Sequence, residues 1–544
     1  MLRGRGRGLG HGRGGFYHSL PGERNMKHVW WVFALALAGC KPSSVPPKPL
    51  GEPLVRGQLS NIQLLPGGTH VRFLADARSP QTQETASLLK LGKLYLFNLK
   101  TRQQTEVGKQ VANFMEAQHA TADGEYLVFL DAFNVKTKTG SLRCVEVARA
   151  VVGEALGEDV SFFVVSPQTR QLAFVEGGIL KVGELPQGPF KAIAEGVVNL
   201  EFSQDGTMLA FKKRLEENGQ LWVVDLQGVE ERKPRLVAAH TGNYRLSKDG
   251  NKLAFTAKEA PKEVAYRLFF ADTRKESAPK QLSQEMFRFL LSPDERWLAY
   301  IETKTPEKPG MLWIKPLEEK GGEAQMLGDR VMDFGFASTG EALAWREAYY
   351  GNEGLLAVVQ LKGGDLEPQR LTPRTRHWQW NAQGQALAYT AMVSNPEVSV
   401  DLFSFRLGDK APTKVHAWVY EYAFSTDGEK LLFEANCTRE GRSCELLSTR
   451  LQEGEVALKE KLAEGVYSFK QSADGQHMYW LHMTPTAPVQ TQLWVTGMAN
   501  PSPQKLADHI HLPPPLALDE TGKKFLYISN QPGHEGLYLT EMKP

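Results

Sequence analysis

Hydrophobic and polar residues alternate through most of the chain, and turn-forming residues interrupt the alternation at regular intervals. Residues 200–211, LEFSQDGTMLAF, are typical: apolar residues at every second position flank Asp205 and Gly206. Alternation with period two predicts strands, and Asp-Gly predicts a two-residue hairpin turn that uses φ > 0 conformations. This stretch therefore predicts a β-hairpin.

The same pattern recurs along the whole body of the chain, about every 44 residues. The successive turn positions are Gly68, Gly124, Thr169, Gly206, Gly250, Glu295, Gly340, Gly384, Gly428, Gly475 and Gly522. Five residues after each stands an aromatic: Phe73, Phe129, Phe174, Phe211, Phe255, Tyr300, Trp345, Tyr389, Phe433, Trp480 and Tyr527. Three residues after each turn the side chain is also apolar, so both positions face the same side of a strand. We expect these two columns to form the core.

Most repeats contain a third strand, such as residues 220–226, and a short fourth one, without helical periodicity. Four strands in this length predict one blade of an all-β protein, a β-propeller of about eleven four-stranded repeats. Because one ring usually has four to eight blades, we expect two rings, residues 54–283 and 284–544, with one large ring as the alternative. The last repeat stops after its third strand, and residues 52–59 are expected to supply the fourth strand, which removes an open edge.

Two of the repeats carry a family resemblance. The stretches SPDERWLAY at residues 292–300 and FSTDGEKLLF at residues 424–433 resemble the WD-like repeats of TolB-type propellers. Related repeats occur in propeller domains of prolyl-oligopeptidase-type enzymes, whose hydrolase domain lies outside the propeller. The resemblance implies the fold over residues 54–544, and says little of activity because one fold hosts many functions.

The N-terminal region resembles the signal of bacterial lipoproteins. Lys27 and His28 precede an apolar run over residues 29–38, and the sequence Leu-Ala-Gly-Cys ends at Cys40. By this resemblance residues 26–39 are a signal peptide, and Cys40 is diacylated and becomes the mature N-terminus. A hydrophobic leader with a chance cysteine is the alternative. Lys41 follows the cysteine, which in the family's sorting pattern favours the outer membrane.

The segments on either side of this signal are interpreted from composition. Residues 1–25 are rich in Arg and Gly; an RNA-binding tail is one interpretation, and an upstream start-site error, hence a non-native extension, is the one we favour. Residues 40–53 contain five prolines, which favour an extended tether.

Charge gives no sign of a nucleic-acid partner. The formal net charge is +2, and the first 39 residues carry six Lys or Arg and one acid. Without them the chain is close to neutral, whereas a nucleic-acid-binding domain is usually basic.

The chain has four cysteines, of which Cys40 is assigned to lipidation. Cys437 and Cys444 flank a short loop between two predicted strands, and in an exported protein this spacing indicates a disulfide. Two free thiols are the alternative, because spacing does not establish Cα geometry. We expect Cys144, in a predicted third strand, to be a buried small hydrophobe.

No motif for metal, cofactor or nucleophilic catalysis is found. His509 and His511, like the other histidines, lack zinc-site spacing, and there is no GxSxG sequence. Asp401 and Glu347 are interpreted as solvated loop residues, although acid or base roles stay open. We therefore expect no catalytic residues, no metal and no cofactor.

One aromatic cluster is a candidate binding site on the inner strands of two adjacent repeats. Trp378, Trp380 and Tyr422 fall on or match positions of the repeat core, so packing explains them first. His377 lies beside them, and Trp418 and Tyr420 lie outside the core columns. These last three residues are the candidate ligand-binding residues, for a sugar or a peptide.

The function expected from these features is a non-enzymatic protein-interaction scaffold, TolB-like, anchored by lipid in the cell envelope. A carbohydrate- or peptide-binding propeller with hydrolase or lyase activity at the ring axis is the alternative. The expected partners are a membrane, through the lipid, and an envelope protein. We expect the protein to be exported and held at the outer membrane.

The anchor gives the first test. Cys40→Ala should move the protein from the membrane fraction to the soluble fraction, because a chain without the acylated cysteine lacks the expected lipid anchor. Immunoblots of the two fractions measure the change, with Cys144→Ala as the matched control. Retention of the Cys40→Ala protein on membranes would contradict the lipoprotein interpretation.

Overall fold

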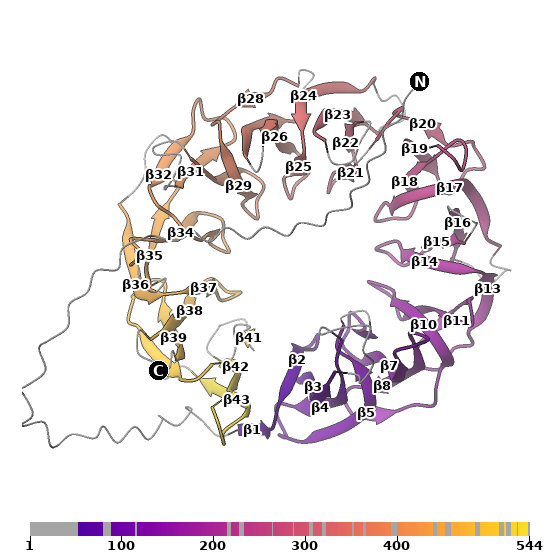
Figure 1. The fold of residues 1–544 in the computed structure, drawn as a ribbon, viewed down its shortest axis with the longest axis horizontal. Helices are drawn as coiled ribbons and strands as arrows, with labels where there is room; N and C mark the ends of the chain where they lie inside the picture. Colours follow the sequence, from indigo (N-terminus) through magenta and orange to yellow (C-terminus); the bar gives the residue numbers. More distant parts are fainter. Residues whose placement is uncertain are drawn as a thin grey trace, which may run out of the picture. The chain divides into compact units, whose positions relative to one another are not determined.

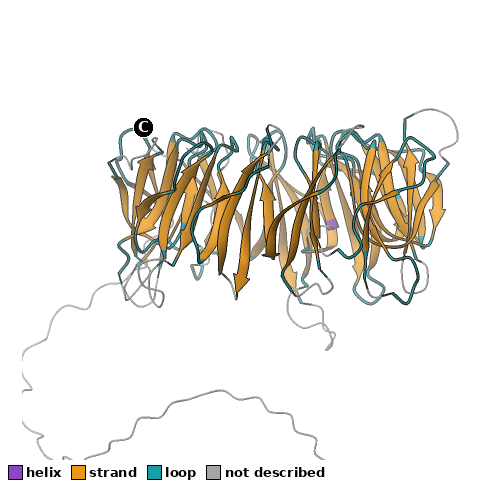
Figure 2. Ribbon diagram, turned by 90° about the horizontal axis from the view of Figure 1, so that it is seen from above, coloured by secondary structure: helices purple, strands orange, loops and turns teal. Residues whose placement is uncertain are grey.

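The computed structural model describes residues 53–541 except for short gaps. The gaps are residues 80–88, 115–116, 215–218, 228–232, 264, 287, 304–307, 318–321, 351–352, 363–365, 393–399, 439–442, 452–457, 485–489, 511–515, 518–523 and 530. Contacts divide the chain into two units, Met1–Pro47 and Lys48–Pro544. In the described part of the second unit all 43 named elements are β-strands (Figure 2). The expected all-β class is confirmed.

The described strands form antiparallel sheets that follow one another along the chain. Five of the four-stranded sheets contain β2 (Leu59–Leu64), β3 (His70–Arg78), β4 (Leu91–Asn98) and β5 (Gln104–Ala112); β21 (Arg288–Leu291), β22 (Trp297–Glu302), β23 (Gly310–Pro316) and β24 (Gln325–Val331); β33 (Tyr422–Phe424), β34 (Lys430–Ala435), β35 (Cys444–Arg450) and β36 (Glu460–Val466); β37 (Ser468–Gln471), β38 (His477–Met483), β39 (Thr491–Gly497) and β40 (Gln504–Ala507); and β1 (Pro53–Arg56), β43 (Gly536–Glu541), β42 (Lys524–Ser529) and β41 (Leu516–Ala517).

Three larger sheets join two neighbouring repeats each. They contain β6 (Gln118–Ala120), β7 (Tyr126–Asn134), β8 (Thr139–Glu146), β9 (Val151–Val152), β10 (Gly157–Val165), β11 (Gln171–Glu176), β12 (Ile179–Glu184) and β13 (Lys191–Glu195); β14 (Val197–Phe202), β15 (Met208–Lys213), β16 (Gly219–Asp225), β17 (Arg235–Leu246), β18 (Lys252–Ala257), β19 (Arg267–Asp272) and β20 (Lys280–Gln281); and β25 (Asp333–Phe336), β26 (Ala342–Tyr350), β27 (Glu353–Gln360), β28 (Gln369–Arg370), β29 (Thr375–Trp380), β30 (Ala386–Ala391), β31 (Asp401–Arg406) and β32 (Thr413–His416).

Strand β17 shows how two repeats merge. Its first half pairs with β16, through Leu236 opposite Trp222, and its second half pairs with β18, through Tyr244 opposite Phe255. One long strand is thus the last of one repeat and the first of the next. The repeats remain recognisable, but their sheets are continuous at this point.

The first and last strands belong to the same sheet. β1 pairs with β43 through Val55 opposite Leu537 and Arg56 opposite Gly536, and the two strands lie side by side in Figure 1. The expectation that the N-terminal segment supplies the missing strand of the last repeat is confirmed. This pairing covers an edge that would otherwise leave backbone donors and acceptors unpaired.

The predicted core columns are buried. Every aromatic five residues after a turn position, from Phe73 to Tyr527, is at most 2% exposed. Their side chains pack between successive sheets; one core cluster, for example, combines Ala254 and Leu268 with Leu298 and Tyr300, on both sides of residue 283. Burial of apolar surface between sheets is therefore the main stabilising contact of the described structure.

The Asp-Gly turns differ from the predicted two-residue type. Gly206 has φ +73°, but Asp205 is not among the residues with positive φ. The ladder closes instead at Ser203, whose amide donates to Met208 O at 2.8 Å, with a further bond from the Gly206 amide to Ser203 O. The Asp205 carboxylate accepts bonds from the Ser203 hydroxyl and the Thr207 amide, so its side chain orders a longer loop.

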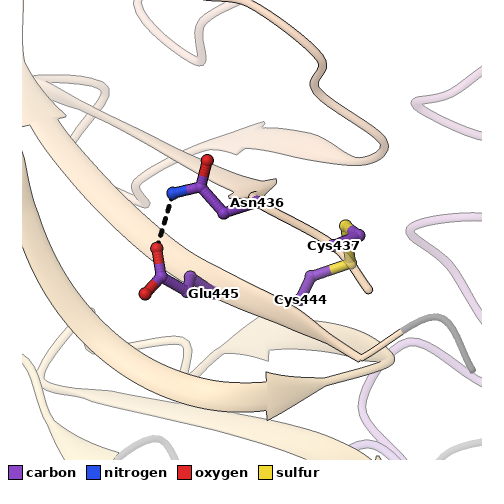
Figure 3. Close-up of a disulfide and its surroundings, with 4 residues drawn as sticks. All are labelled: Asn436, Cys437, Cys444 and Glu445. Carbon is purple, nitrogen blue, oxygen red and sulfur yellow. Dashed lines mark hydrogen bonds between the residues drawn. A yellow bond between two sulfur atoms is a disulfide. The ribbon is translucent and has the colours of Figure 1, made fainter. Parts of the chain in front are cut away.

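Cys437 and Cys444 are joined by a disulfide at the start of β35 (Figure 3). Beside it, Asn436 Nδ2 donates to Glu445 Oε2 at 2.6 Å, so two side-chain links connect the ends of β34 and β35. Cys144 is a free, buried thiol, and burial raises its pKa to about 12. The disulfide clamps a hairpin loop, and Cys144 is not part of it.

Thiol titration tests this arrangement. In the Cys40→Ala protein, denatured without reductant, one thiol should react with an alkylating reagent, and after reduction three should react, because Cys437 and Cys444 are then released. Mass spectrometry counts the adducts. Three adducts before reduction would contradict the disulfide.

Candidate functional site

A pocket lies where β29 and β30 of one repeat face the start of β33 in the next. Its volume is about 520 Å³, within the range of small-molecule sites. The lining residues are Arg376, His377, Trp378, Gln379, Thr390, Val400, Trp418, Val419, Tyr420, Glu421 and Tyr422. The structure thus brings together His377, Trp418 and Tyr420, the three candidate residues of the sequence.

The aromatic side chains of this region have two different roles. Tyr422 donates to Ala388 O and Trp380 donates to Gly335 O, so these rings pack against neighbouring strands as the sequence indicates. Trp418 and Tyr420 are 51% and 69% exposed. Large exposed aromatic surface is unfavourable in water, and its position at a pocket is typical of a binding site.

Trp418 is held in the left-handed conformation, with φ +60°. The same conformation occurs ten residues before the turn in several other repeats, at Asp159, Gly196, His240, Arg330, Arg374 and Gly465. The kink is therefore a property of the repeat and not strain special to the pocket. It positions Val419 to donate to Val400 O and Tyr420 to donate to Glu434 O.

Some polar residues of the pocket already have an ion-pair or hydrogen-bond partner within the protein, and others do not. Arg376 is bound to Glu353 at 3.3 Å, and Glu353 also binds Arg374. His377 is exposed. Thr390 is only 4% exposed, and its hydroxyl has no hydrogen-bond partner among the described residues. An unpaired buried hydroxyl costs free energy that a bound ligand can recover.

Two carboxyl groups lie at or behind the pocket rim. Burial raises the pKa of Glu421, and the charge of Lys470 acts in the opposite direction. Glu434 is 3% exposed; burial, with the nearby Glu421 carboxylate second, raises its pKa to about 8. The amide of Glu434 donates to Glu421 O. Glu434 therefore lies behind the segment that carries Trp418 and Tyr420.

Other candidates from the sequence form no second site. Asp401 is fully buried on β31 and binds Lys414 at 2.7 Å, and Glu347 is buried on β26 and binds Arg370 at 2.5 Å. Their interpretation as solvated loop residues is wrong, because each is a strand residue that faces a cation. Cys40 and His511 lie outside the described residues.

Two kinds of feature are absent from the described residues. These residues contain no group of three or more His, Cys, Asp or Glu side chains arranged to hold a metal ion. The same residues contain no helix that is long and apolar enough to cross a membrane.

Sequence reasoning missed Thr390, Glu421 and Glu434. Thr390 and Glu434 stand six residues after their turn glycines, where earlier repeats have Leu74, Leu130 and Val175. Because the same column also contains Lys212, Thr256 and Arg346, a polar residue there does not by itself single out this junction.

Comparisons with known proteins give no family. No protein-family model matches the chain, and no curated protein matches it. Solved structures with similarity include a eukaryotic initiation factor (15% identity, TM-score 0.38, 67% of this chain and 93% of that one). Others are the tricorn protease (12%, 0.27, 90% and 59%) and an oligogalacturonate lyase in complex with manganese (13%, 0.31, 64% and 98%). At these TM-scores the likenesses carry no argument about function.

The raised pKa of Glu434 gives a pH-dependent prediction. An unfolded glutamate ionises near pH 4.3, whereas folded Glu434 keeps its proton up to about pH 8. The folded state therefore binds more protons between these values, and this contribution to the free energy of unfolding decreases as the pH rises through the window. Glu434→Gln, which stays neutral, should raise the melting temperature at pH 8 and have little effect at pH 4.5.

Glu445→Gln is the matched control on the adjacent strand. Its hydrogen bond from Asn436 lowers the pKa of Glu445, so this variant should lose stability near neutral pH. Melting curves of both variants across the pH range measure the effects. A stabilisation by Glu434→Gln that does not change with pH would contradict the assignment.

Proposed function

We propose that this chain is a lipid-anchored β-propeller of the cell envelope that acts as a non-enzymatic scaffold and holds a partner in the pocket of Trp418 and Tyr420. The observation that carries the proposal is the pair of exposed aromatic side chains at a cavity between two repeats. Aromatic residues are enriched among the energetically dominant residues of interfaces, which supports a macromolecular partner. The lipoprotein-like sequence ending at Cys40 supports export and anchoring.

We further propose that the repeats form one ring of eleven blades, the alternative to two rings. The pairing of β1 with β43 supports closure of the first repeat on the last. A core cluster that extends across residue 283 supports continuity where two rings would divide. The WD-like repeats at residues 292–300 and 424–433 support a relation to TolB-type propellers.

A hydrolase or lyase at the same pocket is the rival function. Its two carboxyl groups would be Glu421 and Glu434, which interact electrostatically. Glu421 lines the pocket, but Glu434 is buried and is absent from its lining. Because a glycoside hydrolase needs both carboxyl groups at the bond that is cleaved, this placement favours the scaffold.

Cross-linking of the protein on intact membranes tests the proposal. The double variant Trp418→Ala and Tyr420→Ala should capture the partner at least tenfold less, because truncation of one dominant aromatic residue typically costs about 2 kcal/mol or more. Quantitative mass spectrometry of the cross-linked species measures the loss.

Met326→Ala is the control, since Met326 is 49% exposed on β24, away from the pocket. Equal capture by the double variant and the wild type would exclude the pocket as the binding site. Turnover of an envelope glycan that is lost in Glu421→Gln would support the rival.

A further inference from the structure

Two cationic side chains that stand six residues after their turn glycine bind the backbone of the next repeat. Lys212, on β15, donates from Nζ to Gly242 O of the next repeat at 3.0 Å. Arg346, on β26, donates to Thr375 O at 3.2 Å and to Arg376 O, again in the next repeat. Gly242 and Arg376 both stand eight residues before their own turn glycine. A cationic side chain thus binds corresponding backbone carbonyls at two junctions.

At the junction that contains the pocket, this position is occupied by Thr390. The residue eight before the next turn glycine is Tyr420, one of the exposed aromatic residues. A threonine is several bonds shorter than lysine or arginine, and its buried hydroxyl has no partner among the described residues. The pocket of about 520 Å³ lies at this junction. The space that a long cationic side chain fills at the junctions of Lys212 and Arg346 is here accessible to a ligand.

The other lining groups suit a cation. The faces of Trp418 and Tyr420 can attract an ammonium or guanidinium group through cation–π interaction. Glu421 provides a carboxylate at the rim, and its partial desolvation means that a nearby cation would stabilise the ionised form. The positive charge of Arg376 is directed to Glu353.

We propose that the pocket binds a primary ammonium or guanidinium group, of the kind carried by a Lys or Arg side chain of the partner, in the place that Lys212 and Arg346 fill at other junctions. This inference rests on the proposed function and specifies the chemistry that the partner presents. The cationic group of the ligand takes the place that the chain's own side chains, Lys212 and Arg346, occupy at two other junctions.

Calorimetric titration of the full mature protein tests the inference. The probes are Nα-acetyl-lysine N-methylamide and its neutral analogue Nα-acetyl-norleucine N-methylamide, which differ in the terminal ammonium group. The lysine probe should bind at least tenfold more tightly than the norleucine probe. Equal binding of the two probes, or no binding of either at millimolar concentration, would overturn the inference.

Three variants locate the binding. Thr390→Arg places a cation on the chain itself, so affinity for the lysine probe should fall at least tenfold while the melting temperature does not decrease. If that variant fails to fold, Trp418→Ala takes its place and should weaken the lysine probe more than the norleucine probe. Lys212→Met, at a different junction, should leave affinity unchanged. Undiminished binding of the lysine probe by a folded Thr390→Arg protein would overturn the assignment.

The experiments distinguish a pocket that binds no cationic group from a pocket that binds no partner. A partner that is captured through Trp418 and Tyr420, without any preference of the pocket for the lysine probe, would overturn the cationic ligand alone. Capture that does not depend on these two aromatic residues would overturn the pocket as the site of the scaffold.

Discussion

The structure depends on the burial of one sheet against the next. No single four-stranded sheet can cover its own apolar face, and the aromatic residue five positions after each turn is buried because a neighbouring repeat lies over it. The same requirement applies to the ends of the array, where an unpaired strand edge would be exposed. The pairing of β1 with β43 meets it with a strand taken from the other end of the chain.

Close packing of repeats also brings backbone carbonyls of one repeat toward side chains of the previous one. Lys212 donates to one such carbonyl, and Arg346, which is also paired with Asp333 at 2.6 Å, donates to two. Glu434 occupies the position that corresponds to Lys212 and Arg346. An ionised Glu434 carboxylate could only accept hydrogen bonds and could not bind a carbonyl oxygen. Burial and the charge of Glu421 raise the pKa of Glu434 and so favour its protonated form. A protonated carboxyl group can donate a hydrogen bond, as Lys212 and Arg346 do at this position, so the raised pKa suits a position that faces backbone carbonyls.

The repeat, its strands and its core were predictable because each depends on a periodic pattern. The columns containing Phe211 and Leu209 follow from period-two alternation, and β1 follows from an incomplete last repeat. The turn at Asp205 was not predictable in detail, because its loop length depends on a hydrogen bond from Ser203 to the Asp205 side chain. Likewise Asp401 and Glu347 were misplaced, because sequence spacing does not reveal the cations that pair with them.

The candidate site was only partly predictable, for a related reason. Trp418 and Tyr420 stand out because they fall outside the core columns, whereas Thr390 is distinctive only beside Lys212 and Arg346. Neighbouring junctions of a repeat protein share one geometry, so a space can open where one repeat has a shorter side chain than the Lys212 or Arg346 found at two other junctions. The shortening at Thr390 opens space, and the kink at Trp418, which the repeat imposes in any case, places an aromatic ring at its edge. The proposed recognition at this junction would therefore use the backbone of the repeat unchanged, with Thr390 and Trp418 in positions that the fold already defines.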